Sequence, residues 1–217
     1  MEPQKMAMLG SGKVGRTLGA GLVKHGHHVM LGSRDPSSDC VKDWVAHTGP
    51  MASAGTYPEA VEWADWVFFC VPGTAVETVS ALVGRGALAG KLVVDVTNAI
   101  TTVDDDHMTL SWGIDDSAAL HIQRTNPGAR VVKAFNTTGV NSMIDPDVPC
   151  APPMMPICGN DAEAKAEVAE LLRDVGWEPC DLGPIHVAAM IEAMTLAWVQ
   201  YGRVTGTWNH CYKFVHR

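Results

Sequence analysis

The chain has 217 residues, of which 47% are hydrophobic and 18% are charged, and its formal net charge at pH 7 is −8. This composition is typical of a globular domain and excludes an intrinsically disordered chain, which has too little apolar surface to bury. A net negative charge disfavours nucleic acid and anionic membrane surfaces as partners, so any phosphate group must be bound locally.

Cysteine usage and the apolar stretches indicate the compartment. No C-x-x-C pair occurs, so neither a zinc ribbon nor a thioredoxin-type motif is predicted. The first residues lack the apolar core of a signal peptide. The longest apolar stretch, residues 185–201, contains Glu192 and is shorter than a membrane span of about 20 residues. We therefore expect a cytoplasmic protein without a membrane anchor, with free thiols at Cys40, Cys70, Cys150, Cys158, Cys180 and Cys211.

Apolar runs of strand length alternate along the chain with segments of helical period. The first strand is expected at residues 6–9, and Val14, Leu18 and Leu22 predict a helix after it. Further strands are predicted at residues 28–31, 66–70, 92–96 and 131–135, with a weaker strand signal among prolines at 154–158. Further helices are predicted at residues 40–47, 161–174 and 185–201.

This alternation defines the fold class. Strands that are apolar on both faces suit a parallel sheet covered by helices on both sides. The sequence therefore predicts a doubly wound, mostly parallel α/β fold of the Rossmann type. The proline-rich residues 146–156 are the predicted junction between a first unit, residues 1–145, and a C-terminal extension, residues 146–217, that adds two strands and two helices and closes the sheet.

A glycine-rich motif follows the first strand and opens the first helix. Gly10 allows a tight turn, Gly12 lets the backbone approach a pyrophosphate, and Gly15 lets the helix pack closely on the strand. The N-terminus of the helix offers unpaired N–H groups to the phosphates. In this context the motif predicts a dinucleotide site in the first unit. Its residues are Gly10, Ser11, Gly12, Lys13, Val14 and Gly15.

The end of the second predicted strand distinguishes NADP from NAD. An NAD enzyme usually places a carboxylate there, but this chain has Ser33 and Arg34. A hydroxyl and a guanidinium can bind a 2′-phosphate, which a carboxylate would repel. We expect NADP, with Asp35 as the alternative ribose ligand if the cofactor is NAD.

Other polar and aromatic groups have simpler explanations. The histidines at positions 25, 27 and 28 belong to a predicted turn, and residues 104–107 lack the spacing of a calcium loop, so no metal site is predicted. Trp44, Trp63 and Trp66 are expected to pack in the core. No Ser-His-Asp set or pair of carboxylates stands out, and no catalytic residue is assigned. That pattern suits hydride transfer between two cofactors, which depends on positioning.

Five motifs occur in the order found in one family. They read G-S-G-K-V-G, L-G-S-R-D-P, V-V-D-V-T-N, V-V-K-A-F-N-T and E-P-C-D-L-G-P, the last before an apolar helix. From about residue 5 to residue 202 the chain resembles the NADP oxidoreductases that depend on the deazaflavin coenzyme F-420. It is also similar to the reductase domain of STEAP-type ferric reductases, without their haem-carrying membrane domain. Where the family often adds a lysine after the arginine, Ser37 and Ser38 stand here, and Lys42 is the nearest substitute.

The resemblance implies roles for the residues that match the family motifs. The glycine-rich loop would cradle the NADP pyrophosphate, and Ser33 with Arg34 would hold the 2′-phosphate. The nicotinamide ribose and ring would lie against residues at the ends of the predicted strands 66–70, 92–96 and 131–135, close to the second cofactor. These residues are Val71, Pro72, Asn98, Ala99, Ala134, Phe135 and Asn136.

These observations support one leading hypothesis and two alternatives. The leading one is an NADPH-dependent oxidoreductase that transfers hydride between NADP(H) and a deazaflavin or flavin such as FMN or FAD. An NADPH-dependent reductase of a small carbonyl or imine is the second, although Asn136 and Thr137 are poor proton donors for it. A non-catalytic NADP(H)-binding sensor is the third.

The helix at residues 185–201 predicts a homodimer. Its apolar residues cover more than one core-facing stripe, so a second subunit is expected to bury the remainder, as the resembling family also implies. Glu192 is the exception on this helix and needs a hydrogen-bonding partner, because an unpaired buried carboxylate is costly. The apolar residues are Ile185, Ala188, Ala189, Ile191, Met194, Leu196, Ala197, Trp198 and Val199.

Overall fold

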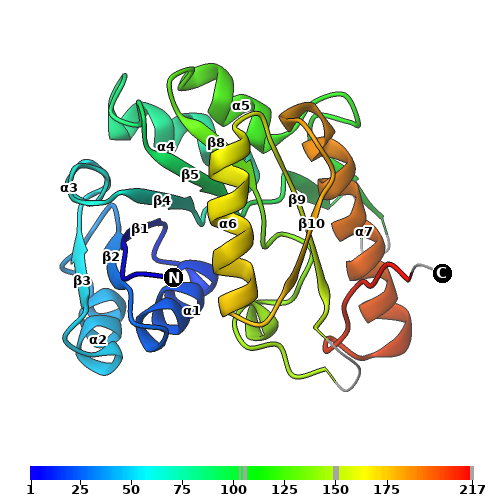
Figure 1. Ribbon diagram of the computed structural model, residues 1–217, viewed down its shortest axis with the longest axis horizontal. Helices are drawn as coiled ribbons and strands as arrows, with labels where there is room; N and C mark the ends of the chain where they lie inside the picture. Colours follow the sequence, from blue (N-terminus) through cyan, green and yellow to red (C-terminus); the bar gives the residue numbers. More distant parts are fainter. Residues whose placement is uncertain (103, 105–106, 149–151, 216–217) are drawn as a thin grey trace.

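Eight strands of the computed structural model form one sheet (Figure 1). The structure describes residues 1–102, 104, 107–148 and 152–215. A separate antiparallel hairpin consists of β6 (Ile100–Thr102) and β7 (Met108–Leu110). From one edge of the sheet to the other, the strands are β10 (Glu178–Asp181), β9 (Met154–Gly159), β8 (Arg130–Lys133), β5 (Leu92–Asp95), β4 (Trp66–Phe69), β1 (Lys5–Leu9), β2 (His28–Gly32) and β3 (Ala52–Gly55).

The pairing confirms the predicted mostly parallel α/β fold. The strands from β8 to β3 pair in parallel throughout, whereas β9 runs antiparallel to β8 and pairs in parallel with β10. Each strand predicted from the sequence is present, including the proline-flanked one, which is the fully buried β9. The division into residues 1–145 and 146–217 stays a prediction, and residues 149–151 of the predicted junction lie outside the described residues.

Seven helices are described, and the sequence predicted four of them. The predicted ones are α1 (Lys13–Lys24), α2 (Asp39–Thr48), α6 (Ala162–Asp174) and α7 (Ala188–Thr205). The unpredicted ones are α3 (Tyr57–Trp63), α4 (Val76–Val83) and α5 (Ala118–Thr125), which have only seven or eight residues each. Helices this short show barely two turns of apolar periodicity, so tertiary packing decides them.

Helices cover both faces of the sheet and create two hydrophobic cores. Side chains of a strand alternate between faces, so Met6 and Met8 of β1 join α1, α2 and α6 in one core. Ala7 and Leu9 join α3, α4, α5 and α7 in the other. The tryptophan prediction holds, because Trp44 and Trp66 are buried in the first core and Trp63 packs against the second.

Part of the apolar surface of α7 that a second subunit was expected to bury is buried by the chain itself. After α7 the C-terminal tail, residues 206–215, turns back along the helix. Trp198 is buried, its indole Nε1 donates to the carbonyl of His210 over 2.9 Å, and its ring stacks on the His210 imidazole. The prediction that a second subunit must cover Trp198 is therefore wrong, since sequence periodicity cannot show that a tail folds back.

Candidate functional site

The glycine-rich loop between β1 and α1 has the predicted geometry. Gly10 has a φ of +129°, and a Cβ there would lie 2.5 Å from the carbonyl oxygen of Cys70. A Cβ at Gly15 would lie 2.0 Å from the carbonyl oxygen of Gly10. Contacts this short exclude any side chain. Both glycines are therefore required by the packing of the loop against its own fold.

Gly12 differs from these two glycines. It is the N-cap of α1, its φ is −71°, and no atom lies within 4 Å of the position that its Cβ would occupy. The protein itself would tolerate a side chain there, so the space in front of Gly12 is open. No side chain caps this end of α1, which leaves the first-turn N–H groups available to an anion.

Ser33 and Arg34 follow β2 beside this loop. Ser33 is buried, and its Oγ lies 3.2 Å from Ser11 Oγ and accepts a hydrogen bond from the Asp35 N–H. Arg34 is exposed. The Asp35 carboxylate accepts hydrogen bonds from the hydroxyl and the N–H of Ser37, and these bonds lower the pKa of Asp35. Asp35 thus has a partner within its own turn, whereas Arg34 beside it is exposed to solvent.

A cavity of about 350 Å³ lies at the carboxyl ends of the central strands. Segments after β1, β4, β5 and β8 meet there, as expected for a ligand site in an open α/β sheet. Seven of the predicted site residues line it: Gly12, Lys13, Val14, Val71, Pro72, Asn98 and Asn136. Six residues that the sequence analysis did not select complete the lining: Cys70, Val96, Thr97, Thr138, Val140 and Met143.

The other predicted residues lie around this cavity rather than on its wall. Ala99, Ala134 and Phe135 are buried, and Phe135 packs against Phe68 with ring centroids 6.4 Å apart. Phe135 has a φ of +63°, an uncommon conformation for a residue with a side chain, directly before Asn136. Gly10 and Gly15 shape the loop, whereas Ser11, Ser33 and Arg34 lie toward the end of β2.

Three buried polar atoms in residues of the cavity wall have no hydrogen-bond partner among the described residues. They are Thr97 Oγ1, Asn136 Oδ1 and Thr138 Oγ1. The Asn136 amide is held in place, because its Nδ2 donates to Asn98 Oδ1, the Ile191 carbonyl and Thr195 Oγ1. Buried polar atoms are nearly always paired in folded proteins. These three atoms belong to residues that line one cavity, so a polar ligand or bound water could pair with them there.

Behind this wall lies a buried cluster of three charged side chains. Lys133 Nζ donates to Asp95 Oδ2 over 2.8 Å and to Glu192 Oε1 over 3.0 Å. Glu192 thus has the partner that the sequence demanded, but the sequence analysis missed Lys133 and Asp95. A signal was present, since each charge interrupts an apolar strand and the two residues lie opposite each other on β5 and β8.

Burial and the neighbouring charges shift the pKa values of Lys133 and Glu192 in opposite directions. Burial alone would lower the pKa of Lys133, but the adjacent carboxylates of Asp95 and Glu192 outweigh it and raise that pKa. Burial raises the pKa of Glu192, against the opposing effect of Lys133. In the cavity wall itself, burial raises the pKa of the Cys70 thiol, which keeps it neutral at physiological pH.

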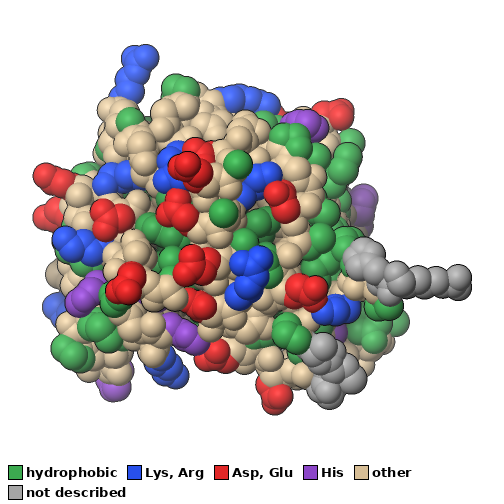
Figure 2. Space-filling model, viewed as in Figure 1, with side chains coloured by type: hydrophobic (Ala, Val, Ile, Leu, Met, Phe, Trp, Pro, Cys, Tyr) green, Lys and Arg blue, Asp and Glu red, His purple; other side chains and the backbone are tan. Residues whose placement is uncertain are grey.

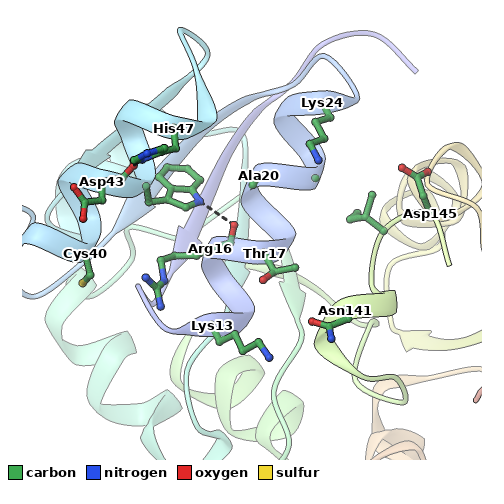
Figure 3. A pocket seen from close by; sticks show the side chains of 13 residues that line it. Lys13, Arg16, Thr17, Ala20, Lys24, Cys40, Asp43, His47, Asn141 and Asp145 are labelled. Carbon is green, nitrogen blue, oxygen red and sulfur yellow. Dashed lines mark hydrogen bonds between the residues drawn. The ribbon is translucent and has the colours of Figure 1, made fainter. Parts of the chain in front are cut away.

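A larger groove of about 760 Å³ lies on the outer side of α1 (Figure 3). It begins at Lys13, which also lines the smaller cavity, and runs along α1 to Lys24. Trp44 closes one wall, where its Nε1 donates to the carbonyl of Arg16 over 2.8 Å. Figure 3 shows Cys40, Asp43 and His47 on α2, facing Asn141 and Asp145 across α1.

Neither a metal site nor a membrane-spanning helix is found among the described residues. No group of three or more His, Cys, Asp or Glu side chains is arranged to hold a metal ion. Asp105 and Asp106 of the acidic loop lie outside the described residues. None of the helices in the described ranges has both the length and the apolar character needed to cross a bilayer.

The chain is similar to a family of known oxidoreductases and to individual proteins. Residues 5–99 match the model of the family described as NADP oxidoreductase, coenzyme F420-dependent. The chain is 31% identical to the metalloreductase STEAP3 of Rattus norvegicus over 90% of its own length, but it spans only 37% of that protein. It is 28% identical to an F420-dependent NADP reductase of Methanocaldococcus jannaschii, covering 88% of this chain and 89% of that one.

Solved structures agree in fold. A proposed F420-dependent NADP reductase from Arthrobacter sp. FB24 superposes with a TM-score of 0.91 at 32% identity, over 98% of this chain and 100% of that one. An imine reductase from Aspergillus terreus, solved with NADPH4 and dibenz[c,e]azepine, has a TM-score of 0.68 at 22% identity over 95% of this chain and 64% of that one, which shows a shared fold alone. The identity over the whole length of the Arthrobacter protein shows that the chain belongs to the family of coenzyme F420-dependent NADP oxidoreductases.

Proposed function

We propose that this protein is an NADP-dependent oxidoreductase that transfers hydride between NADP(H) and a deazaflavin or flavin. The observation that carries the proposal is the 350 Å³ cavity, where open space at Gly12 meets a wall with three unpaired polar atoms. A dinucleotide would place its pyrophosphate at Gly12 and the first turn of α1, and its nicotinamide in the cavity.

The residues of the site fit each part of NADP(H). Lys13 and the N–H groups at the start of α1 suit the pyrophosphate, and Ser33 with the exposed Arg34 suits the 2′-phosphate. The nicotinamide carboxamide has two N–H donors and one carbonyl acceptor, which match the unpaired Asn136 Oδ1 and the two threonine hydroxyls. When bound, the nicotinamide supplies the hydride chemistry, and the chain binds it, orients it and excludes water.

The titratable groups of the cavity favour a second cofactor as the hydride acceptor. Reduction of a small carbonyl or imine needs a proton donor within hydrogen-bonding reach. The lining contains only two titratable side chains, the Lys13 amine and the neutral Cys70 thiol. Hydride transfer to a deazaflavin or flavin needs no protein acid beside the reacting carbon, because the acceptor ring delocalises the negative charge that the hydride brings.

A spectrophotometric screen tests the proposal. NADPH oxidation is followed at 340 nm with F420, FMN or FAD as acceptor, and cyclohexanone and a cyclic imine serve as small-molecule controls. We expect turnover with F420 or a flavin only. Turnover with the carbonyl or imine alone would replace the proposal with the small-molecule reductase. Stoichiometric NADPH binding without turnover by any acceptor would instead favour the sensor.

We further propose that the protein is a homodimer of the cytoplasm. Met190, Tyr201 and Val204 form an exposed apolar stripe on α7, and Trp208 and Phe214 of the tail are also exposed. Hydrophobic side chains gather in Figure 2 at the edge where α7 lies in Figure 1. A patch of this kind commonly marks a subunit contact. The free thiols of all five described cysteines suit the reducing cytoplasm.

A further inference from the structure

The buried cluster of Asp95, Lys133 and Glu192 does more than neutralise its own charges. Lys133 and Asp95 are fully buried and Glu192 is 1% exposed, so each charge is removed from water. Burying charges carries a large desolvation penalty, and a hydrophobic replacement is often as stable. The ion pairs themselves therefore explain little of why charges are buried here. The backbone groups that these side chains bind offer a better explanation.

Each member of the cluster binds backbone of the segment between β5 and β6. Asp95 Oδ1 accepts from the Thr97 N–H over 2.9 Å, and Lys133 Nζ donates to the Thr97 carbonyl. Glu192 Oε2 accepts from the Ala99 N–H over 3.4 Å. This segment carries Thr97 and Asn98 into the cavity wall, so three charged side chains on β5, β8 and α7 determine its conformation.

Two further contacts support this arrangement, one that anchors the cluster and one that joins two residues of the wall. Glu192 Oε1 accepts from the Ala118 N–H at the start of α5 over 3.0 Å, which fixes the carboxylate from its other side. Asn98 Nδ2 donates to the carbonyl of Asn136 over 3.0 Å. The position of Asn98 therefore affects Asn136, whose Oδ1 is one of the unpaired polar atoms.

We propose that Glu192, Lys133 and Asp95 are positioning residues that hold the wall formed by residues 97–99 in the shape that receives the nicotinamide. This inference rests on the proposed function, since it assumes that NADP(H) binds in the cavity. None of the three side chains lines the cavity, so they act through Thr97 and Asn98. The adenosine half of the dinucleotide, near Ser33 and Arg34, is outside their influence.

The affinities of NADPH and 2′-phospho-ADP-ribose test the inference, because the second ligand lacks only the nicotinamide. Both are measured by calorimetry on the full chain. In the native protein NADPH should bind more tightly, and the ratio of the two dissociation constants reports the nicotinamide contacts. In Glu192→Gln we expect NADPH to weaken roughly 10-fold, the equivalent of one or two hydrogen bonds. Binding of 2′-phospho-ADP-ribose should change less than about twofold.

Two more variants separate positioning from stability. Glu192→Asp keeps the charge but withdraws the carboxylate by one methylene, so it should lose the nicotinamide contribution while keeping Lys133 neutralised. Ser80→Ala removes a buried hydroxyl that accepts from Asn126 Nδ2, away from the cavity. It should lower the melting temperature and leave the ratio of dissociation constants unchanged.

Several results would overturn the inference. Equal weakening of both ligands in Glu192→Gln and Glu192→Asp would show a general structural role, and an unchanged ratio would show that the wall does not depend on the cluster. A native protein that binds 2′-phospho-ADP-ribose but gains nothing from the nicotinamide would also refute it. Failure of the native protein to bind either ligand would refute the proposed function itself, and the inference with it.

Discussion

Single glycines in the loop after β1 have separable roles at the residue scale. Gly12→Val adds a side chain where the structure has open space, so the fold should persist while NADPH and NADH binding are both lost. Gly15→Val places a side chain against the Gly10 carbonyl, so it should lower the free energy of unfolding by roughly 3 kcal/mol or more. Chemical denaturation and calorimetry distinguish the two. NADPH binding by Gly12→Val would place the dinucleotide elsewhere.

Arg34 is the residue expected to select the cofactor. Arg34→Ala removes a charge-assisted contact with the 2′-phosphate, worth about 1.5–3 kcal/mol, and should weaken NADPH on the order of 10- to 100-fold. NADH lacks that phosphate, so its dissociation constant should stay nearly constant. Fluorescence titration with both nucleotides measures the effect, and Lys24→Ala, at the opposite end of α1 from the glycine-rich loop, serves as the cationic control. Equal affinities of the native protein for NADPH and NADH would contradict the assignment.

At the scale of elements, Asp161 determines where α6 begins. Its carboxylate accepts from the Ala164 N–H over 2.8 Å and from Arg130 Nε over 3.1 Å. These bonds lower the pKa of Asp161 below its usual value of 3.8. A lowered pKa in the folded state stabilises the protein above the unfolded value, and this contribution disappears as the pH falls through the folded value.

Asp161→Ala should therefore lower the free energy of unfolding by about 1 kcal/mol at pH 7, as for other lost N-caps. The difference from the native protein should shrink as the pH falls below 3.8, because the native carboxyl then becomes protonated. Urea denaturation at several pH values measures it. Asp161→Asn keeps a capping oxygen and should retain part of the stability. A difference independent of pH would show that the charge of Asp161 is irrelevant.

At the scale of the whole molecule, the exposed stripe on α7 predicts the assembly. Val204 is 76% exposed, so Val204→Glu should leave the monomer folded and dissociate the proposed dimer. Leu82→Glu, on α4, also adds a charge at a half-exposed leucine and should leave the assembly unchanged. Light scattering gives the mass. A native mass near 23.2 kDa would refute the dimer.

Trp198 is unsuitable as a position for testing the subunit interface, although the apolar periodicity of α7 placed it among the expected interface residues. Its ring lies beneath the tail, with Trp208 at a centroid distance of 5.7 Å and His210 at 4.4 Å. A charge at this position would disrupt packing within the monomer before it affected a partner. The dimer prediction therefore rests on Met190, Tyr201 and Val204, which the tail leaves exposed.

Local patterns in the sequence were sufficient for six of the eight strands of the sheet and for the dinucleotide loop, but they missed β3 and gave no range for β10. A strand apolar on both faces, such as residues 66–69, needs helices on both sides, whatever its neighbours are. The glycine-rich motif also acts locally, because the tight turn at Gly10 and the open space at Gly12 follow from the backbone between β1 and α1. These features depend on residues close together in the chain, and periodicity and spacing report them directly.

Only the tertiary structure decided which distant residues meet. Glu192 needed a partner, but the sequence did not show that Lys133, 59 positions earlier, would provide it from β8. Thr97 and Thr138 joined the cavity wall because β5 and β8 are neighbours in the sheet, a pairing set by strand order. The tail likewise covers Trp198 only because the chain after α7 folds back onto the helix. Such contacts arise when elements pack, and each depends on the free energy of the whole fold, which no short stretch of sequence contains.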